Sequence, residues 1–129
     1  MSETPKVPTP RVNPETKPFW DATQEGKFLI KHCNACSEHY WYPRTMCPLC
    51  HSTDTTWRQS SGRGKIYSYS VMRRAPVPYA MAFVTLEEGI TVMTNIVDCD
   101  LDSIAIDQPV RVIFRQSEDG AAVPYFTPA

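Results

Sequence analysis

The residues best suited to chemistry are four cysteines arranged in two pairs. Each pair has the spacing Cys-x-x-Cys, and ten residues separate the pairs: Cys33, Cys36, Cys47 and Cys50. Each pair can wrap one side of a tetrahedral ion, and four thiolates at about 2.3 Å form the preferred closed coordination of structural zinc. The spacing therefore predicts one zinc ion per chain. Because four cysteine ligands leave no position for water, we do not expect this metal to be catalytic.

Other uses of these cysteines fit the sequence less well. Disulfides would need an oxidising compartment, and a redox-active pair would need a βαβ setting that the flanking sequence does not provide. Iron is the nearest rival, because a rubredoxin-like cage uses the same four ligands. Neighbouring His32, His39 and His51 are expected to surround the site or face solvent. Cys99 has no partner at useful spacing and is expected to be a half-buried apolar residue.

No catalytic residue can be assigned from the sequence. Gly-x-Ser-x-Gly, P-loop and Gly-x-Gly-x-x-Gly motifs are absent. The Asp and Glu residues fall mostly in expected turns, and no pair of them sits in an apolar setting, so neither a general acid nor a general base can be nominated.

A group of basic residues interleaved with tyrosines begins near a glycine pair, Gly62 and Gly64. It could be solvated surface, a platform for stacked bases, or a surface for the phosphates of an acyl carrier such as coenzyme A. Its members are Arg63, Lys65, Tyr67, Tyr69, Arg73, Arg74 and Tyr79. We expect Arg73, Arg74 and Tyr79, in the loop 73–79, to contact a partner or acyl-CoA, because aromatic residues and Arg are favoured at interface centres.

Length and composition bound the remaining choices. The chain has 129 residues, of which 42% are hydrophobic, enough for one core. A net charge of −1 argues against a strongly basic nucleic-acid clamp or a polybasic membrane binder. No apolar run is long enough to cross a membrane, and the N-terminal residues lack the apolar region of a secretory signal. We therefore expect a cytoplasmic protein in a reducing setting.

The elements that position these residues are mostly strands. A short helix is predicted over Pro18–Glu25, with Asn13 as an earlier cap and Gly26 after its end. From Lys27 onward the apolar period changes to two, which is typical of strands. Predicted strands cover 27–31, 40–42, 65–72, 80–86, 90–97, 109–114 and 123–126, with another starting at 55 and a short helix or turn over 101–107.

This pattern predicts a mainly β protein with four parts. They are a flexible arm (1–13), an N-terminal helix (14–26), a four-cysteine zinc ribbon (27–58) and a five-stranded OB-fold barrel (59–129). Five strands in the last seventy residues suit a small barrel, whereas a sandwich normally has about seven strands.

The order helix, knuckle, barrel resembles a known family. These are acyl-CoA-associated proteins with a rubredoxin-like zinc ribbon and an OB-fold domain, long catalogued as a domain of unknown function. The resemblance covers about 14–128 and rests on Pro18-Phe-Trp20, the cysteine pairs with Pro43-Arg44, Gly62-Arg-Gly64, Leu86-x-x-Gly89, Thr94-Asn95, Pro109-Val-Arg-Val112 and Pro124-x-Phe126. The family often has Gly where this chain has Ser37, and Gly just before Pro109, where this chain has Asp107-Gln108.

The resemblance implies a non-catalytic accessory subunit. Members of the family are similar in accompanying thiolase-fold enzymes, including thiolases, acyltransferases and aldolases, and they help to hold the acyl-CoA. The alternative is a zinc-ribbon and OB-fold protein that binds single-stranded nucleic acid, because OB barrels host both functions. The slightly acidic net charge favours the accessory subunit, since single-strand binders usually offer a positive groove. An independent acyl-CoA hydrolase is disfavoured by the missing catalytic set.

Overall fold

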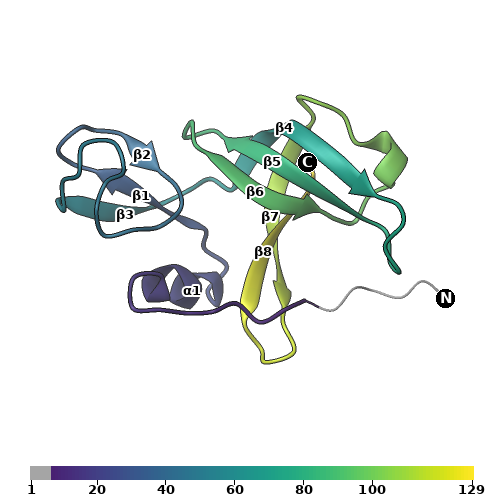
Figure 1. The fold of residues 1–129 in the computed structure, drawn as a ribbon, viewed down its shortest axis with the longest axis horizontal. Coiled ribbons are helices and arrows are strands. Elements are labelled where there is room, and N and C mark those ends of the chain that lie inside the picture. Colours follow the sequence, from purple (N-terminus) through teal and green to yellow (C-terminus); the bar gives the residue numbers. More distant parts are fainter. Residues whose placement is uncertain (1–6) are drawn as a thin grey trace.

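The computed structural model describes residues 7–129, which form one short helix and eight strands (Figure 1). In chain order the elements are α1 (Lys17–Thr23), β1 (Leu29–Cys33), β2 (His39–Tyr40), β3 (Thr55–Gln59), β4 (Arg63–Met72), β5 (Tyr79–Leu86), β6 (Thr91–Ile96), the 3-10 turn η1 (Leu101–Ser103), β7 (Pro109–Gln116) and β8 (Ala122–Pro128). No helix in this part of the chain is long and apolar enough to cross a membrane. The predicted mainly β fold is confirmed.

Helix α1 starts one residue before the predicted span and ends two residues before its end. Pro18 lies in the first turn, where its missing N–H costs nothing. Asn13 caps a separate turn before the helix, since its Oδ1 accepts a bond of 2.9 Å from the backbone N–H of Thr16. At the other end, Gly26 has a left-handed φ of 74° and donates to the carbonyl of Thr23, so that it turns the chain toward β1.

The ribbon is a three-stranded antiparallel sheet in the order β2-β1-β3. Strand β1 begins two residues later than predicted, because Lys27 still belongs to the helix exit and donates to the carbonyl of Ala22. Strand β2 ends at Tyr40 rather than residue 42. Trp41 leaves the sheet to pack against Phe19 and Phe28, with ring centroids 5.4 and 5.5 Å away.

The second half of the chain is a closed barrel in the order β4-β5-β6-β8-β7. All pairings are antiparallel except that between β6 and β8. The glycine pair 62–64 lies where β4 meets its neighbours. A Cβ on Gly62 would lie 2.4 Å from Val112 Cγ1, and one on Gly64 would lie 2.5 Å from the carbonyl oxygen of Thr85. These glycines therefore allow the close strand approach that closes the barrel.

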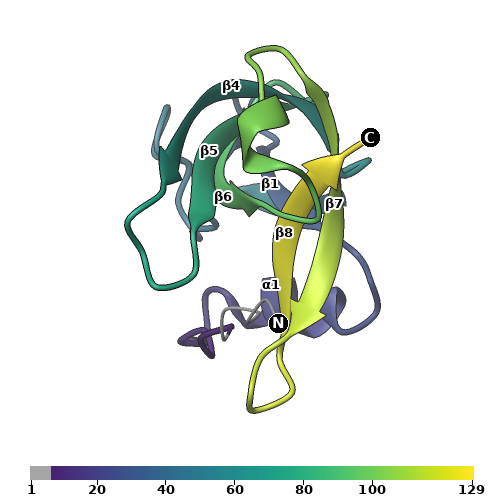
Figure 2. The ribbon, with the colours of Figure 1, turned by 90° about the vertical axis from the view of Figure 1, so that its right-hand side faces the viewer.

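Aromatic packing joins the helix, the ribbon and the barrel into one core. Phe19 of α1 meets Phe28, which precedes β1, at a centroid distance of 5.5 Å. Phe28 in turn meets Phe126 of β8 at 6.1 Å. Figures 1 and 2 both show α1 beside β8. The ribbon is thereby held at a fixed position on the barrel.

The predicted flexible arm lies partly outside the described residues. Its described portion, from Val7 onward, has no regular structure, and the hydroxyl of Thr9 donates to Asp119 Oδ2 at 3.0 Å and to Ser117 Oγ at 3.3 Å. Both partners belong to the turn between β7 and β8. The four-part division of the chain stays a prediction.

Candidate metal centre

The two cysteine pairs sit on two turns of the same design. The first turn follows β1, and the backbone N–H of Ser37 donates to the carbonyl of Cys33 at 2.9 Å. In the second turn the N–H of His51 donates to the carbonyl of Cys47, also at 2.9 Å. Both turns return the chain sharply, so each one presents two thiols to the same side.

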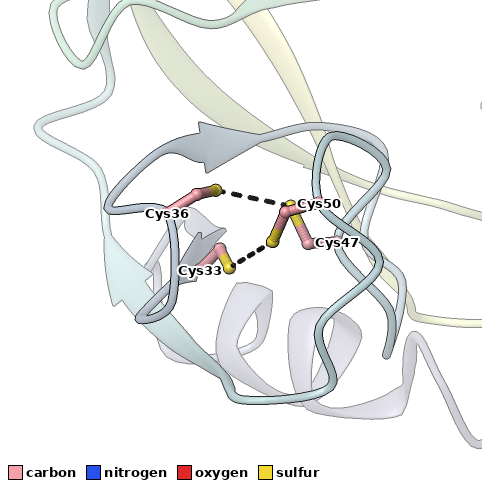
Figure 3. A group of neighbouring side chains, drawn as sticks. All are labelled: Cys33, Cys36, Cys47 and Cys50. Carbon is pink, nitrogen blue, oxygen red and sulfur yellow. Dashed lines mark hydrogen bonds between the residues drawn. The ribbon is translucent and has the colours of Figure 1, made fainter.

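The four sulfur atoms converge on one point (Figure 3). All four lie within 4.8 Å of one another, with 3.5 Å between Cys33 and Cys50 and 3.8 Å between Cys36 and Cys47. A tetrahedron with metal–sulfur bonds of about 2.3 Å has edges of about 3.8 Å. All four thiols are free, so the disulfide alternative is not realised. The ribbon therefore holds four cysteines positioned to bind a metal ion.

The electrostatics of the cluster require a cation. Burial raises the pKa of the Cys47 thiol, but hydrogen bonds from the backbone N–H groups of Cys50 and Leu49 and from the thiols of Cys36 and Cys33 together bring it down to about 7. Burial, and then the sulfur of Cys33, raise the pKa of Cys36 to about 12. Four thiolates this close cannot all ionise unless a positive ion lies among them. A divalent ion such as Zn²⁺ supplies that charge, and the thiolate donors suit it.

The site is closed rather than open. Cys33 and Cys47 are completely buried, whereas Cys50 is exposed at the surface. With four sulfur ligands, the ion has no position for substrate, so its contribution is to fix the two turns relative to each other. Tyr40 packs against the buried thiols, and its hydroxyl donates to the carbonyl of Arg44 at 2.5 Å, which fastens the chain between the turns.

The histidines stay apart from the thiol cluster. His32 and His39 face each other across β1 and β2 with ring centroids 4.9 Å apart. His51 occupies the left-handed position after the second pair. The metal-ligating group found within residues 7–129 consists of the four cysteines. Cys99 is half-buried against the barrel core, and burial together with Asp100 and Asp98 raises the pKa of its thiol.

Sequence reasoning overlooked Lys31, which lies in the middle of β1. Its side chain is 94% removed from solvent because Tyr40 and Trp57 lie opposite it on the two neighbouring strands. The amine sits 4.7 Å from the centre of the Trp57 ring, and burial lowers its pKa. Strand alternation was the available signal, since Lys31 falls on the same face as Cys33.

The basic residues do not form one surface. Arg63 begins β4 and Arg73 follows its last residue, so roughly 30 Å of strand separates them. Arg63 and Lys65 line a cavity of about 530 Å³ together with Tyr67. At the other end Arg73 pairs with Asp102 at 2.7 Å. The structure therefore separates the loop carrying Arg73, Arg74 and Tyr79 from Arg63 and Lys65.

Family comparisons agree with this architecture. Residues 20–56 match the family described as "ChsH2, rubredoxin-like zinc ribbon domain", and residues 57–115 match "ChsH2, C-terminal OB-fold domain". The zinc-ribbon domain thus matches the segment in which the four thiols converge, and the OB-fold domain matches most of the barrel.

Two named proteins are similar to this chain in sequence. The chain is 38% identical over 110 residues to a "DUF35 domain-containing scaffold protein" of Methanocaldococcus jannaschii, covering 78% of each chain. It is 32% identical over 127 residues to a "Probable enoyl-CoA hydratase alpha subunit" of Thermomonospora curvata, covering 95% of this chain but only 40% of that protein.

Solved structures show the same fold. A chain of the "Ltp2-ChsH2(DUF35) aldolase" superimposes with a TM-score of 0.84 and 30% identity, covering 93% of this chain and 98% of that one. A DUF35-family protein of unknown function from Sulfolobus solfataricus superimposes with a TM-score of 0.66 at 11% identity, covering 90% and 86%. The chain belongs to the ChsH2 (DUF35) family, in which a rubredoxin-like zinc ribbon precedes an OB-fold barrel.

Proposed function

We propose that this chain is a non-catalytic accessory subunit that assembles with a thiolase-fold acyltransferase, thiolase or aldolase in the cytoplasm and supports acyl-CoA or acyl-group transfer. The observation that carries the proposal is the match to the "Ltp2-ChsH2(DUF35) aldolase" chain, which extends over nearly the full length of both chains. Other relatives are named as a scaffold protein and as hydratase alpha subunits. The names given to these relatives are thus those of subunits and scaffolds, which act together with other chains.

The chemistry of the described residues supports a non-catalytic, accessory role. The metal centre is coordinatively closed, so no metal-bound water is available to attack a thioester. Within residues 7–129, the side-chain hydrogen bonds of the histidines run from His32 to Asn34 and Arg58, and none joins a histidine to Ser, Thr or Cys. An acyl-transfer partner with its own nucleophile would supply what this chain lacks.

The properties of the loop 73–79 suit contact with the partner or with acyl-CoA. Arg73 is paired with Asp102, but both side chains are more than half exposed, and exposed ion pairs contribute little. Arg73 can therefore exchange Asp102 for a partner carboxylate or a phosphate at small cost. Arg74 is exposed beside it, and Tyr79 adds an aromatic ring at the start of β5. We assign the ribbon and this loop to the contact region.

The nucleic-acid alternative gains no support from the fold. OB-folds bind oligonucleotides on the face formed by their second and third strands, here β5 and β6. Those strands carry no Lys or Arg. Arg63 and Lys65 lie at one end of β4 and Arg73 and Arg74 follow its other end, while Arg115 is paired with Asp98. A continuous positive groove is therefore missing from residues 7–129.

The proposal is tested by isolating the chain from its source cells with a tag and assaying three samples: the chain alone, the co-purifying enzyme subunit alone and their mixture. Acyl-CoA turnover should require the enzyme subunit and rise on addition of this chain. Turnover by the chain alone, unchanged by mixing, would reveal an overlooked active site. A subunit that is fully active by itself would show that this chain is not needed.

A matched pair of variants separates the contact loop from general charge effects. Replacing both Arg73 and Arg74 by Glu should weaken either assembly, seen by gel filtration, or the apparent acyl-CoA affinity. Arg111→Glu changes an exposed arginine on β7, opposite Arg63 and far from the loop, and should leave both unchanged. Equal effects of the two variants would remove the loop from the contact region.

A further inference from the structure

The outer face of the sheet β4-β5-β6 carries large apolar side chains together with uncharged polar ones. Strand pairing arranges them in three cross-strand rows on one side of the sheet. The rows are Met72–Tyr79, Ser70–Met81–Asn95 and Ser68–Phe83–Met93. Figure 2 shows these three strands side by side along one flank of the barrel, away from α1. At one end of this face, Tyr79 and Asn95 lie beside Val7 and Pro8 of the N-terminal segment. Eight neighbouring positions on this outer surface thus carry no charged side chain.

On this face the larger side chains of a strand are exposed and the smaller ones on its other side are buried, which is the reverse of the usual arrangement. On β5 the small residues Ala80 and Ala82 point into the barrel and are buried, while the larger Met81 and Phe83 point outward. Met93 on β6 is 63% exposed, Phe83 44% and Met81 37%. Single exposed apolar residues are ordinary, but a contiguous group marks a surface that another molecule covers.

The face is also shaped to receive side chains. A hollow of about 140 Å³ lies among Ser68, Ser70, Met81 and Phe83, and a second of about 290 Å³ lies among Tyr79, Met81, Met93 and Asn95. Each is smaller than the roughly 300–1,000 Å³ typical of small-molecule sites. Two shallow hollows on either side of Met81 suit protruding apolar side chains of a folded protein.

The chemistry of the face selects among occupants. A polyanion such as nucleic acid would find no cation among the eight side chains of the three rows, although affinity for phosphates depends on Lys and Arg. A protein partner whose own surface is largely uncharged would bind this face without such cations. Aromatic residues and methionine are enriched at protein interfaces, and the unbranched thioether side chain of methionine adapts its shape to a partner.

We propose that this uncharged face, Met72, Tyr79, Met81, Phe83 and Met93 with the intervening polar residues, is where the partner enzyme subunit docks, through an apolar surface whose protruding side chains fill the two hollows. The inference rests on the proposed accessory function and adds to it the surface used. It continues the contact loop 73–79, because Met72 and Tyr79 flank that loop. The loop supplies charge at the edge, and the sheet supplies the apolar centre.

Methionine oxidation provides a direct readout. The tagged chain is purified from its source cells with the enzyme subunit bound, treated briefly with hydrogen peroxide, and compared with the free chain by peptide mass spectrometry. Met81 and Met93 should be oxidised at least about tenfold more slowly in the complex. Met46, which is 49% exposed on the ribbon, reports in the same sample on the other proposed contact region, so that protection of the sheet is measured separately from protection of the ribbon. Equal oxidation of Met81 and Met93 in the two states would overturn the assignment.

Substitutions give a second, independent test. The double variant Met81→Glu with Met93→Glu should bind the enzyme subunit at least about thirty-fold more weakly, as expected when central apolar contacts are lost. Ile106→Glu is the matched control, since Ile106 is 54% exposed and apolar but lies outside the sheet. Thermal unfolding of all variants verifies that the barrel is intact. Normal binding by a folded double variant would overturn the assignment.

The remaining outcomes are distinguishable. If no enzyme subunit co-purifies with the wild-type chain, the accessory function and the docking face both fail. If a complex forms but neither protects Met81 and Met93 from oxidation nor is weakened by the double variant, the accessory function stands and the docking face fails. If the free chain has twice its expected mass in gel filtration and Met81 and Met93 are already protected, a second copy covers the face. If single-stranded nucleic acid protects them at physiological salt, the occupant is nucleic acid.

Discussion

Ser37 and His51 occupy equivalent positions in the two cysteine turns. Each directly follows the second cysteine of its pair, each has a left-handed φ (62° and 65°), and each donates its backbone N–H to the carbonyl of the first cysteine at 2.9 Å. The left-handed conformation is costly for any residue with a Cβ. The ribbon therefore accepts strain twice in order to present four thiols to one point.

Ser37→Gly should stabilise the metal-loaded chain by about 1 kcal/mol, because glycine adopts positive φ without the steric cost that serine meets. Thermal or urea unfolding measures the change. Ser70→Gly is the control, since Ser70 lies in the extended strand β4, where glycine lowers stability. A destabilised Ser37→Gly variant would show that the serine side chain contributes an interaction worth more than the relieved strain.

Cys47→Ser should abolish stable metal binding and unfold the ribbon. Cys47 is completely buried, and a hydroxyl is a poor substitute for a thiolate. Structural zinc sites contribute roughly 10–16 kcal/mol of apparent binding free energy coupled to folding. Elemental analysis should find one zinc per wild-type chain and much less in the variant, and a strong chelator should reproduce the variant's loss of structure. A red iron chromophore would assign the site to iron.

Local spacing explains why the metal centre was foreseeable. Two Cys-x-x-Cys pairs specify their own turns, so the four ligands could be named before their geometry was known. The strands were foreseeable for a similar reason, because alternation is a local pattern. The short helix was located within two residues for the same reason, since Pro18 and Gly26 mark its ends.

Features that depend on three-dimensional arrangement were not foreseeable. Alternation on β5 shows that its two faces differ, but it does not show which face is buried. The narrow barrel takes the alanines inside and leaves the larger Met81 and Phe83 outside. Likewise, Arg63 and Arg73 looked like neighbours because they flank the same strand, yet the length of that strand keeps them apart. Sequence proximity along an extended strand is not spatial proximity.

Cys99 should be the one thiol of the metal-loaded chain that reacts with iodoacetamide, and it should react slowly. The other four of the five cysteines converge in the ribbon. Burial and the charges of Asp100 and Asp98 raise the pKa of Cys99, so its reactive thiolate is scarcer at pH 7 than in an ordinary cysteine, and its rate should keep rising above pH 9. Intact mass should show one addition per folded chain and five after chelation and unfolding. Rapid labelling at pH 7, or two additions to the loaded chain, would contradict this assignment.

Binding to single-stranded nucleic acid should be weak and should disappear at physiological salt. The net charge of the chain is −1, and the two strands that face oligonucleotides in OB-folds carry no cation. On the barrel, attraction is expected from exposed cations at the two ends of β4: Arg63 and Lys65 with the neighbouring Arg111 at one end, and Arg73 and Arg74 at the other. Each neutralised phosphate lowers the logarithm of the binding constant by about 0.7 per tenfold rise in salt, so a few contacts fade quickly. Fluorescence anisotropy with a labelled oligonucleotide at several salt concentrations measures both affinity and slope. Sub-micromolar affinity at physiological ionic strength would favour a nucleic-acid-binding role over an accessory subunit, and loss of that affinity in Arg63→Glu would locate the contact at the start of β4.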